Sequence, residues 1–349
     1  MLAVRWHAPK DVRVEDVPIP TVPTPGTAIV EVAYCGLCGT DLHEYLHGPN
    51  MIRPNAHPLT GQAPPITLGH EFSGTVVAMD GEAPGIEVGT RVVADPCIRC
   101  GVCRWCVNGE YHICARGGSL GLAADGALAR FVVVPLSQLY RVPDNVSLEL
   151  AALAEPLSVG LHAARRGDIR PGEHVLIIGA GPIGISALLG AIAAGAASVY
   201  VSEPTATRAG HAKAFGATEV FDPTETDVRR EVFTRTGRIG PDVVIDATGR
   251  PELIEQAIRT TRRGGRVVIA GISDTTIPVD LRQVVLYERT IIGSLGYNHD
   301  LPRVLDLIAA GRIDPTGLIT AVRPLRDTPA VLDELAADRG THLKVLLTN

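Results

Sequence analysis

The sequence predicts an α/β protein with two domains, one rich in β-strands and one built on a parallel sheet flanked by helices. A chain of 349 residues is long enough for two domains. Roughly the first 150 residues form short apolar and β-branched runs separated by Gly and Pro, which is typical of a β-rich domain. From about Leu157, strand-like runs alternate with helical runs, as they do in a parallel sheet covered by helices.

The composition argues against several classes of function. With 46% hydrophobic and 20% charged residues, the chain is an ordinary soluble globular protein. Its net charge of −6 and its lack of a basic run argue against a nucleic-acid partner. The uncharged stretch 175–202 is long enough for a membrane helix of about 20 residues. Because glycines and a proline interrupt it, a strand, a turn, a helix and a second strand explain it better. We expect a cytoplasmic protein with no membrane partner.

The β-rich domain contains two segments with residues that could bind a metal ion. Strands are predicted at Ala28–Ala33, Phe72–Met79, Arg91–Ala94 and Ala129–Val134. The segment Cys38-Gly-Thr40-Asp41-Leu-His43 follows the first of these, and Leu68-Gly-His70-Glu71 immediately precedes the second.

Together with Glu155 near the domain boundary, these segments offer one thiolate, one imidazole and two carboxylates. Such a set is suited to an open zinc site, in which a substrate or water takes the remaining position. Simpler explanations exist for each residue. His70 could be a structural histidine, Glu155 could cap a helix, and Cys35 with Cys38 could form a redox pair.

A second group of cysteines has the spacing C-x₂-C-x₂-C-x₇-C and comprises Cys100, Cys103, Cys106 and Cys114. Thiolates at this spacing can surround one tetrahedral ion, and four of them leave no position open, so the predicted site is structural. Disulfides or buried apolar cysteines are the alternative, which clustered cysteines in a reducing compartment argue against. Cys97 adds an ambiguity, because it could bind the ion in place of Cys114.

The second domain shows the alternation of a parallel sheet. The predicted strands are Val175–Ile178, Ser198–Val201, Val243–Ile245 and Arg266–Ala270. The predicted helices between them are Ile183–Ala194, Ala206–Phe215 and Glu252–Thr260. After about Tyr297 we expect a helix at Leu301–Ala310, a helix at Pro329–Ala336 and a final strand at Leu343–Leu347.

A glycine-rich turn joins the first of these strands to its helix, with the sequence Gly179-Ala-Gly181-Pro182-Ile183-Gly184. In this strand–helix context the pattern is the dinucleotide-binding fingerprint. Gly179 permits the tight turn, Gly181 lets the backbone approach a pyrophosphate, and Gly184 lets helix and strand pack closely. The helix N-terminus then offers its free N–H groups to the phosphates.

The next strand ends at Glu203, about 20 residues after the glycines, where a carboxylate binds the adenosine ribose hydroxyls. A carboxylate there repels a 2′-phosphate, so the sequence favours NAD over NADP. A solvated charge at the strand end is the alternative. Arg208 could tolerate a 2′-phosphate or could only line the adenosine pocket.

These motifs together resemble the zinc-dependent medium-chain alcohol dehydrogenases over the full length of the chain. The motifs that carry the resemblance are Cys38-Gly-Thr-Asp-Leu-His43, Gly69-His-Glu-Phe-Ser-Gly74, the four-cysteine group, Glu155-Pro-Leu-Ser-Val-Gly160 and Gly179-Ala-Gly-Pro-Ile-Gly184. Within the family the chain most resembles the 2,3-butanediol dehydrogenases, and the sorbitol-type polyol dehydrogenases come next. One departure is Gly126-Ala-Leu-Ala-Arg-Phe131, where relatives usually have Gly-Gly-Phe-Ala-Glu-Tyr.

The resemblance implies a fold and a cofactor set. It implies a GroES-like catalytic domain at residues 1–156 and 298–349 and a Rossmann domain at residues 157–297. It implies two zinc ions per chain, one catalytic and one structural, with NAD as the cosubstrate. The structural zinc would be held by the set that ends at Cys114. We also expect a homo-oligomer, a dimer or a tetramer.

The resemblance also implies a mechanism. Cys38 and His70 would bind the catalytic zinc, with Glu71 and Glu155 bound directly or through water. The zinc would lower the pKa of the bound alcohol. Thr40 would take the proton, which would pass through the nicotinamide ribose to His43 while hydride moves to NAD⁺. Alternatively, Thr40 would only cap a helix starting at Asp41. The small-molecule substrate would be a secondary alcohol or vicinal diol, foremost 2,3-butanediol or acetoin, with a polyol as the alternative.

Overall fold

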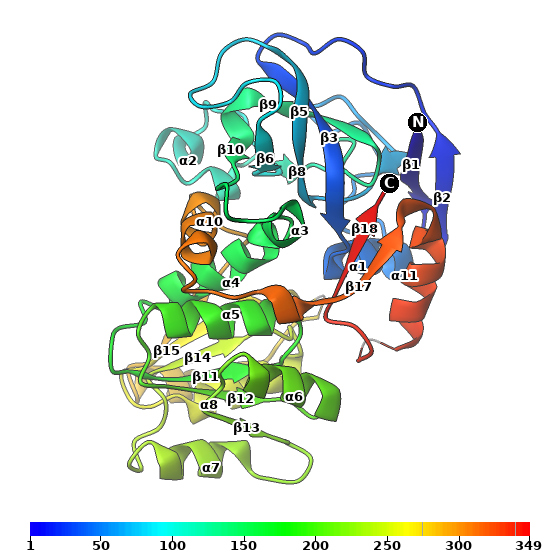
Figure 1. Cartoon of the computed structure of the whole chain (residues 1–349). Coiled ribbons are helices and arrows are strands. Elements are labelled where there is room, and N and C mark those ends of the chain that lie inside the picture. Colours follow the sequence, from blue (N-terminus) through cyan, green and yellow to red (C-terminus); the bar gives the residue numbers. More distant parts are fainter. Residues whose placement is uncertain (274, 339) are drawn as a thin grey trace. The chain divides into compact units, whose positions relative to one another are not determined.

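The computed structural model describes residues 1–349 except 274 and 339, and the chain forms two compact units. One unit comprises residues 1–155 and 301–349, and the other comprises residues 156–300. The α/β prediction is confirmed, because the first unit is rich in β-strands and the second contains a six-stranded parallel sheet (Figure 1).

The first unit contains mainly antiparallel strands. They are β1 (Leu2–Ala8), β2 (Asp11–Asp16), β3 (Thr27–Gly36), β4 (Ile66–Thr67), β5 (Glu71–Asp80), β6 (Arg91–Ala94), β7 (Cys97–Ile98), β8 (Gly118–Ser119), β9 (Phe131–Pro135), β10 (Leu139–Arg141), β17 (Ile319–Pro324) and β18 (Lys344–Thr348). Its helices are α1 (Gly39–His47), α2 (Arg104–Val107), α3 (Leu148–Ala151), α10 (Leu301–Ala309) and α11 (Thr328–Ala337), with short 3₁₀ turns at Tyr111–Ile113, Leu136–Gln138, Thr316–Leu318 and Leu325–Asp327. Helix α4 (Ala154–Arg166) begins at the boundary of the two units.

Strand β3 organises the first unit, because it pairs with β5, β9 and β18. Its residues Ala28, Val30, Val32 and Cys35 are buried in the main core of the unit. The last strand of the chain, β18, lies beside β3 (Figure 1), where Leu346 pairs with Gly36 and Leu347 with Cys35. This pairing carries residues near position 344 to the end of β3, where α1 begins.

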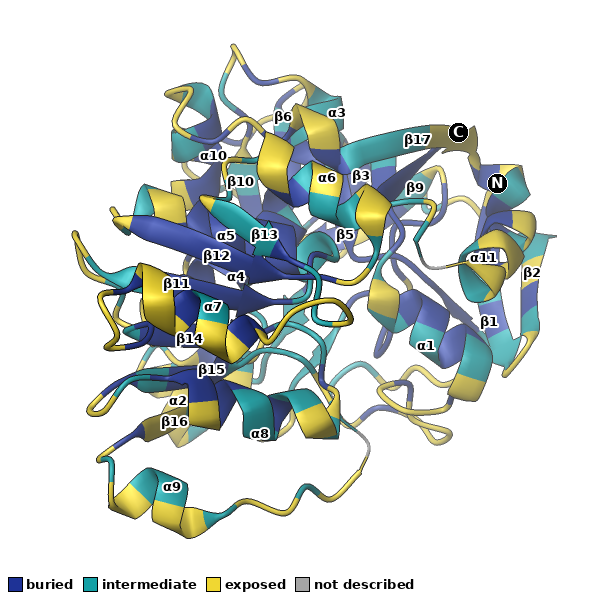
Figure 2. Cartoon of the chain, turned by 90° about the horizontal axis from the view of Figure 1, so that it is seen from below, coloured by how far each residue is buried: buried dark blue, intermediate teal, exposed yellow. Residues whose placement is uncertain are grey.

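The second unit alternates strands and helices. Its strands are β11 (His174–Ile178), β12 (Ser198–Ser202), β13 (Glu219–Phe221), β14 (Val243–Asp246), β15 (Arg266–Ile269) and β16 (Thr290–Gly293). Its other helices are α5 (Pro182–Ala193), α6 (Ala206–Ala214), α7 (Val228–Arg235), α8 (Pro251–Thr260) and α9 (Leu281–Val285). The sheet has the order β13-β12-β11-β14-β15-β16. Central strands of a parallel sheet are buried on both faces, which explains their continuous apolar runs (Figure 2).

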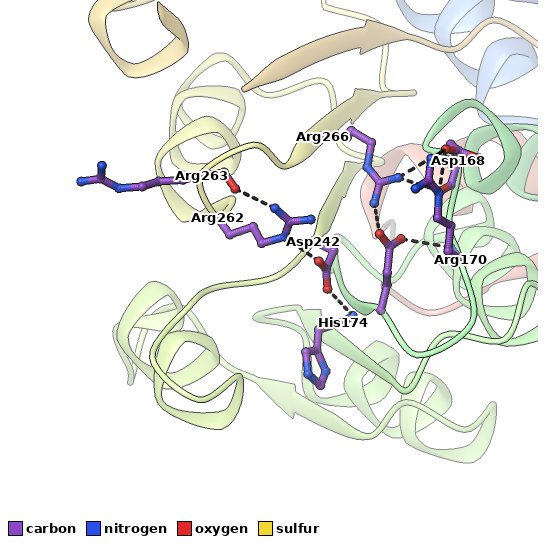
Figure 3. Close-up of polar contacts among 8 residues, drawn as sticks. Asp168, Arg170, His174, Asp242, Arg262, Arg263 and Arg266 are labelled. Atoms are coloured by element: carbon purple, nitrogen blue, oxygen red, sulfur yellow. Dashed lines mark hydrogen bonds and ion pairs between the residues drawn. The ribbon is translucent and has the colours of Figure 1, made fainter. Parts of the chain in front are cut away.

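Ion pairs connect the residues around the starts of β11, β14 and β15 (Figure 3). Asp242 accepts hydrogen bonds from the His174 backbone N–H and the Arg262 side chain. Burial alone raises the pKa of Asp242, but these donors outweigh it and hold the pKa below its usual value. The Arg266 guanidinium likewise forms an ion pair with the Glu173 carboxylate. The acids are thus neutralised where the strands enter the sheet.

The predicted helices and strands lie within two residues of their observed ends, except that β3 runs three residues beyond the predicted end at Ala33. The sequence analysis did not identify β1, which contributes Trp6 to the core. It also missed β2, β13, β16, β17, α7 and α9. One alternative is wrong: Thr40 does not cap a helix that starts at Asp41. Helix α1 begins at Gly39 with Cys38 as its N-cap, because the Asp41 carboxylate accepts the Cys38 N–H at 3.0 Å. Among the described residues, no helix is both long and apolar enough to cross a membrane.

Candidate metal centres and nucleotide-binding loop

Cys38, His70 and Glu71 meet at one point in the first unit. Each offers one ligand atom, and these atoms lie within 4.8 Å of one another. The backbone explains the meeting, because Gly36 at the end of β3 pairs with Glu71 at the start of β5. Cys38 then follows two residues after the end of β3, and His70 immediately precedes β5. A sulfur, a nitrogen and an oxygen donor form a set that zinc accepts.

The Cys38 thiol is in an environment that opposes its charge. Burial, and then the nearby Glu71 carboxylate, raise the pKa of Cys38 to about 12. A thiol must lose its proton to bind a metal, and a bound cation supplies the positive charge that this needs. The chemistry of the donor set therefore fits a divalent cation.

Asp41 lies behind the imidazole of His70. Its Oδ1 atom is 3.8 Å from His70 Nδ1, and among the described residues neither atom has a hydrogen-bond partner although both are buried. Burial lowers the pKa of His70, but the Asp41, Glu155 and Glu71 carboxylates outweigh it and raise the pKa. A carboxylate at Nδ1 leaves Nε2 for the metal, as in the carboxylate–histidine pairs of zinc sites. The sequence analysis quoted Asp41 but assigned it no role at the metal.

Lys344 is a further residue of the centre that the sequence analysis missed. Its Nζ donates to both carboxylate oxygens of Glu71 and, at 2.9 Å, to the Leu37 carbonyl. The side chains of Lys344 and Glu71 are 3% and 1% exposed. Burial lowers the pKa of Lys344, but Glu71 and Cys38 outweigh it and the pKa is raised. A lysine inside an apolar C-terminal strand was the available signal, since buried lysines require a partner.

Glu155 stands in the first turn of α4 and is partly exposed. Its carboxyl is not one of the three groups within 4.8 Å, so the structure brings together three of the four predicted ligand groups. Desolvation raises the pKa of Glu155 well above its usual value; His70 opposes the shift, whereas Glu71 and Cys38 add to it. These electrostatic interactions place Glu155 near the centre, as a carboxyl that can be neutral.

The two residues of the predicted proton path lie on α1. The Thr40 hydroxyl is 3.6 Å from the Cys38 sulfur, which places it beside a metal ligand. His43 follows three residues later, so both residues lie on one face of the helix. The His43 ring contacts the side chain of Asn50, with 3.0 Å between Nδ1 and the amide nitrogen.

The four cysteines of the second group surround one point, and their ligand atoms also lie within 4.8 Å of one another. Backbone N–H groups point at the sulfurs: Cys103 donates to Cys100 at 3.3 Å, and Cys100 donates to Cys114 at 3.4 Å. Backbone N–H groups of Val102 and Cys103 lower the pKa of Cys100 to about 5. We refer to residues 100–114 as the cysteine lobe. Cys97 lies outside the group and contacts the Tyr111 carbonyl instead, so the ambiguity is resolved for Cys114.

In the second unit, the glycine turn has the geometry that its motif predicts. Gly179 has a φ of +93°, which only glycine adopts at low cost. A Cβ at Gly184 would lie 2.0 Å from the Gly179 carbonyl, so the helix can approach the turn only without a side chain. Helix α5 starts at Pro182, followed by Ile183, with Gly181 as its N-cap. Proline suits this first position because no N–H is needed there.

Glu203 lies against this turn and is 4% exposed, which excludes a solvated strand-end charge. Its carboxylate accepts the Ala180 N–H at 2.8 Å and the Thr205 N–H at 2.9 Å. Each carboxylate oxygen has a further lone pair for a ligand hydroxyl. Arg208 is nearby, since its Nη1 is 4.0 Å from where a Cβ would stand at Gly181. Glu203 therefore supports the glycine turn, and an arginine lies over it.

Comparison with known proteins identifies both units. The alcohol dehydrogenase GroES-like domain matches residues 24–144, and the zinc-binding dehydrogenase domain matches residues 182–310. The chain is 38% identical to (R,R)-butanediol dehydrogenase of Bacillus subtilis, over 92% of this chain and 91% of that protein. It is 31% identical to sorbitol dehydrogenase of the same organism, over 99% and 97% of the two chains.

Solved structures are similar over the whole chain. The 2R,3R-butanediol dehydrogenase from Bacillus subtilis has a TM-score of 0.94 at 36% identity, covering 100% of this chain and 99% of that one. A candidate zinc-binding dehydrogenase from Sinorhizobium meliloti 1021, bound to NADP, has a TM-score of 0.91 at 32% identity. An alcohol dehydrogenase from E. coli CFT073, complexed with NADH, has a TM-score of 0.91 at 28% identity. Each of these matches covers 100% of this chain and 99% of the other chain.

Proposed function

The chain belongs to the zinc-dependent medium-chain alcohol dehydrogenases, and from this membership we propose that it is an NAD-dependent dehydrogenase of secondary alcohols and vicinal diols, foremost 2,3-butanediol and acetoin. The observation that carries the proposal is the Cys38–His70–Glu71 centre, which offers a mixed donor set with room for a substrate oxygen. The small-molecule substrate of the family enters there.

Each residue of the centre has a proposed task. Zinc there would act as a Lewis acid on the substrate oxygen, and a bound nicotinamide would exchange the hydride. Cys38 and His70 bind the ion, while Asp41 orients the imidazole through Nδ1. Thr40 holds the substrate hydroxyl and accepts its proton, and His43 releases that proton toward solvent. Lys344 keeps the Glu71 carboxylate neutralised beside the ligands.

The preference for a vicinal diol is attributed to Glu155. Because Lys344 already donates to both oxygens of the buried Glu71, we assign the second substrate hydroxyl to Glu155, which is partly exposed. A carboxyl built to pair a hydroxyl discriminates strongly against substrates that lack one, since it is then left unpaired. A sorbitol-type polyol dehydrogenase is the second candidate, supported by the similarity to the Bacillus subtilis enzyme over nearly the whole chain.

Initial rates with a substrate panel test this proposal. We expect kcat/KM for 2,3-butanediol with NAD⁺ to exceed the values for sorbitol, xylitol and ethanol, with the R-configured carbinol preferred. Higher rates with sorbitol or xylitol would assign the chain to the polyol enzymes and leave the zinc proposal intact. Glu155→Gln is the informative variant. It should lower kcat/KM for 2,3-butanediol more than kcat/KM for ethanol, so the ratio of the two values should fall.

We propose NAD rather than NADP as the cosubstrate because Glu203 brings a buried negative charge to the site of the adenosine ribose. Rates with NAD⁺ and NADP⁺ in the wild type and in Glu203→Ala test this. The wild type should prefer NAD⁺, and the variant should lose part of that preference. Arg208→Ala is the control. If Arg208 instead made the wild type prefer NADP⁺, this variant would lose part of the preference for NADP⁺.

We further propose a homo-oligomer, with a second copy of the chain on the edge of the parallel sheet. Strand β16 is one of the two edge strands of the sheet, and α9 with the residue that follows it exposes Leu281, Val285 and Leu286 by 67%, 70% and 69% (Figure 2). An exposed edge with apolar neighbours is suited to pairing between chains. Light scattering should give a dimer or tetramer, and Leu286→Asp should reduce the assembly. We place the enzyme in the cytoplasm, where cysteines of the lobe stay reduced.

A further inference from the structure

Glu44 is a buried carboxylate on α1 that the chemistry above does not use. Its side chain is 0% exposed, although it neighbours His43 in the sequence. Its oxygens accept three consecutive backbone N–H groups, those of Asn50, Met51 and Ile52, with the Asn50 bond at 3.0 Å and the Ile52 bond at 3.4 Å. A buried carboxylate is costly unless hydrogen bonds compensate it, and here the loop after α1 provides them.

The loop can turn this closely because of its first residue. A Cβ at Gly48 would lie 2.6 Å from a Glu44 carboxylate oxygen and 2.6 Å from the Glu44 carbonyl. That carbonyl also accepts the indole N–H of Trp6 at 3.0 Å, so the core holds the helix turn that carries Glu44. The Glu44 carboxylate therefore holds the backbone of residues 50–52 in a fixed position.

Asn50, on this loop, contacts two residues of α1. Its backbone N–H is held by Glu44, and its side-chain amide nitrogen is 3.0 Å from Nδ1 of His43. The two ends of a side-chain amide are interchangeable in such a contact: the nitrogen donates to a bare Nδ1, or the oxygen accepts from Nδ1–H. Only the second arrangement leaves the Nε2 lone pair free to take up a proton, so we expect the neutral ring to carry its proton on Nδ1. The ring of His47 meets the His43 ring edge-on, with 5.4 Å between centroids, and limits its rotation further.

We infer that Glu44 and Asn50 are positioning residues for His43: Glu44 holds the loop, and Asn50 on that loop holds the imidazole in one orientation and one tautomer. The inference deepens the proposed function, because it rests on the role of His43 in proton transfer. A ring with one orientation and one tautomer exchanges protons through defined nitrogens, which a freely turning ring does not. The gain is in preorganisation of the proton path.

Nitrogen NMR of the whole protein labelled with ¹⁵N-histidine tests the tautomer directly, without a measurement of activity. The His43 signals are assigned by their loss in His43→Ala. In the wild type above pH 8 we expect the shifts of an Nδ1–H imidazole, the tautomer whose Nε2 can take up a proton. In Asn50→Ala they should move toward the averaged values of an unconstrained ring, whereas Asn55→Ala, at an exposed asparagine of the same segment, should leave them unchanged.

Glu44→Gln tests the other half of the inference, because it replaces one acceptor oxygen by a donor that faces the loop N–H groups. Its folded state is checked by circular dichroism, and its His43 signals should move as in Asn50→Ala. Identical His43 spectra in wild type and Asn50→Ala overturn the role of Asn50. An unchanged spectrum in a folded Glu44→Gln overturns the role of Glu44.

A kinetic cycle separates this inference from the proposed function. Asn50→Ala should lower kcat roughly tenfold, part of the 10²- to 10⁴-fold that a positioned acid–base group contributes, with little change in the KM of the alcohol. In a His43→Ala background the same substitution should cost nothing further. Equal losses in both backgrounds overturn the inference. If His43→Ala alone kept the wild-type rate, the proposed proton path would fail while the NMR result stood.

Discussion

The two groups of metal ligands in the first unit are built in opposite ways. The cysteine lobe takes all four sulfurs from residues 100–114, and backbone N–H groups of the same short segment point at them. The Cys38–His70–Glu71 centre draws on the end of β3, the start of β5 and, through Lys344, the start of β18. The lobe is a local structure with a closed donor set, whereas the centre is assembled by the fold and contains buried charges.

The difference teaches how each site depends on the rest of the molecule. Local N–H donors lower the pKa of Cys100 to about 5, so the lobe prepares its first thiolate by itself. Desolvation and then Cys103 raise the pKa of Cys106 to about 12, so a cation is needed to complete the set. Burial and Glu71 raise the pKa of Cys38 to about 12, so the centre needs a cation to obtain its thiolate. A closed sulfur set supports folding, and an open mixed set supports chemistry.

Loss of the lobe should have the largest effect on stability. Cys103→Ser removes one of four sulfurs, and structural zinc in such sites contributes an apparent free energy on the order of 10 kcal/mol to folding. We expect one zinc per chain instead of two, and a thermal midpoint lowered well beyond that of a surface substitution. Cys97→Ser is the matched control, because its sulfur lies outside the group. An unchanged midpoint with both ions retained would break the comparison.

Loss of the centre should have the largest effect on activity. Without the Cys38 ligand, a Lewis-acid contribution of several kcal/mol is lost, which corresponds to roughly a thousandfold in kcat/KM. Cys38→Ser should therefore keep one zinc and nearly the wild-type midpoint while it loses its turnover. Metal analysis and calorimetry on the same sample provide the check. If Cys38→Ser melted as early as Cys103→Ser, the two sites would not differ as described.

The buried ion pair should distinguish the centre from the lobe. Lys344→Met leaves the Glu71 carboxylate buried without its partner, and breaking such a pair costs about 3–5 kcal/mol. Lys344→Arg keeps the charge and should cost less. Denaturant unfolding measures both variants. The zinc content of the lobe should stay the same in each, since Lys344 contacts only the centre and its strand neighbours.

The same pair predicts a smaller effect of pH. The folded-state pKa of Lys344 is raised above its ordinary value near 10.5, so its contribution is complete below pH 10.5 and is lost as the pH rises through the folded-state pKa. The stability difference between wild type and Lys344→Met should therefore be constant between pH 7 and 9 and should narrow above about pH 10.5. A difference that grows in that range would show that the lysine is not charged in the folded protein.

Local patterns in the sequence were sufficient to predict much of the fold and of the candidate sites. The cysteine spacing predicts a group that the structure forms, because four ligands within one short loop need no long-range contact to meet. The glycine turn is similar, since strand, turn and helix are consecutive and Gly179 has the positive φ that the fingerprint requires. Most strand and helix limits followed from the alternation of apolar runs.

Other residues became visible only in three dimensions. Lys344 reaches Glu71 because β18 pairs with β3, and no motif links positions 273 residues apart. Glu44 is charged and stands in a helix, so its sequence context predicts a solvated residue, yet the loop of residues 50–52 covers it. The donors to a buried charge are contributed by whichever segments the fold brings close.

The sequence by itself determined most of the elements, the ligand types and the glycine turn, because short-range spacing and periodicity control which groups are offered. Only the tertiary structure decided how those groups are held: Glu71 by Lys344, and Glu203 by the N–H groups of Ala180 and Thr205. The physical reason is desolvation. A charge in the interior requires specific partners within hydrogen-bond distance, and strand pairing and loop closure, rather than sequence neighbours, supply them.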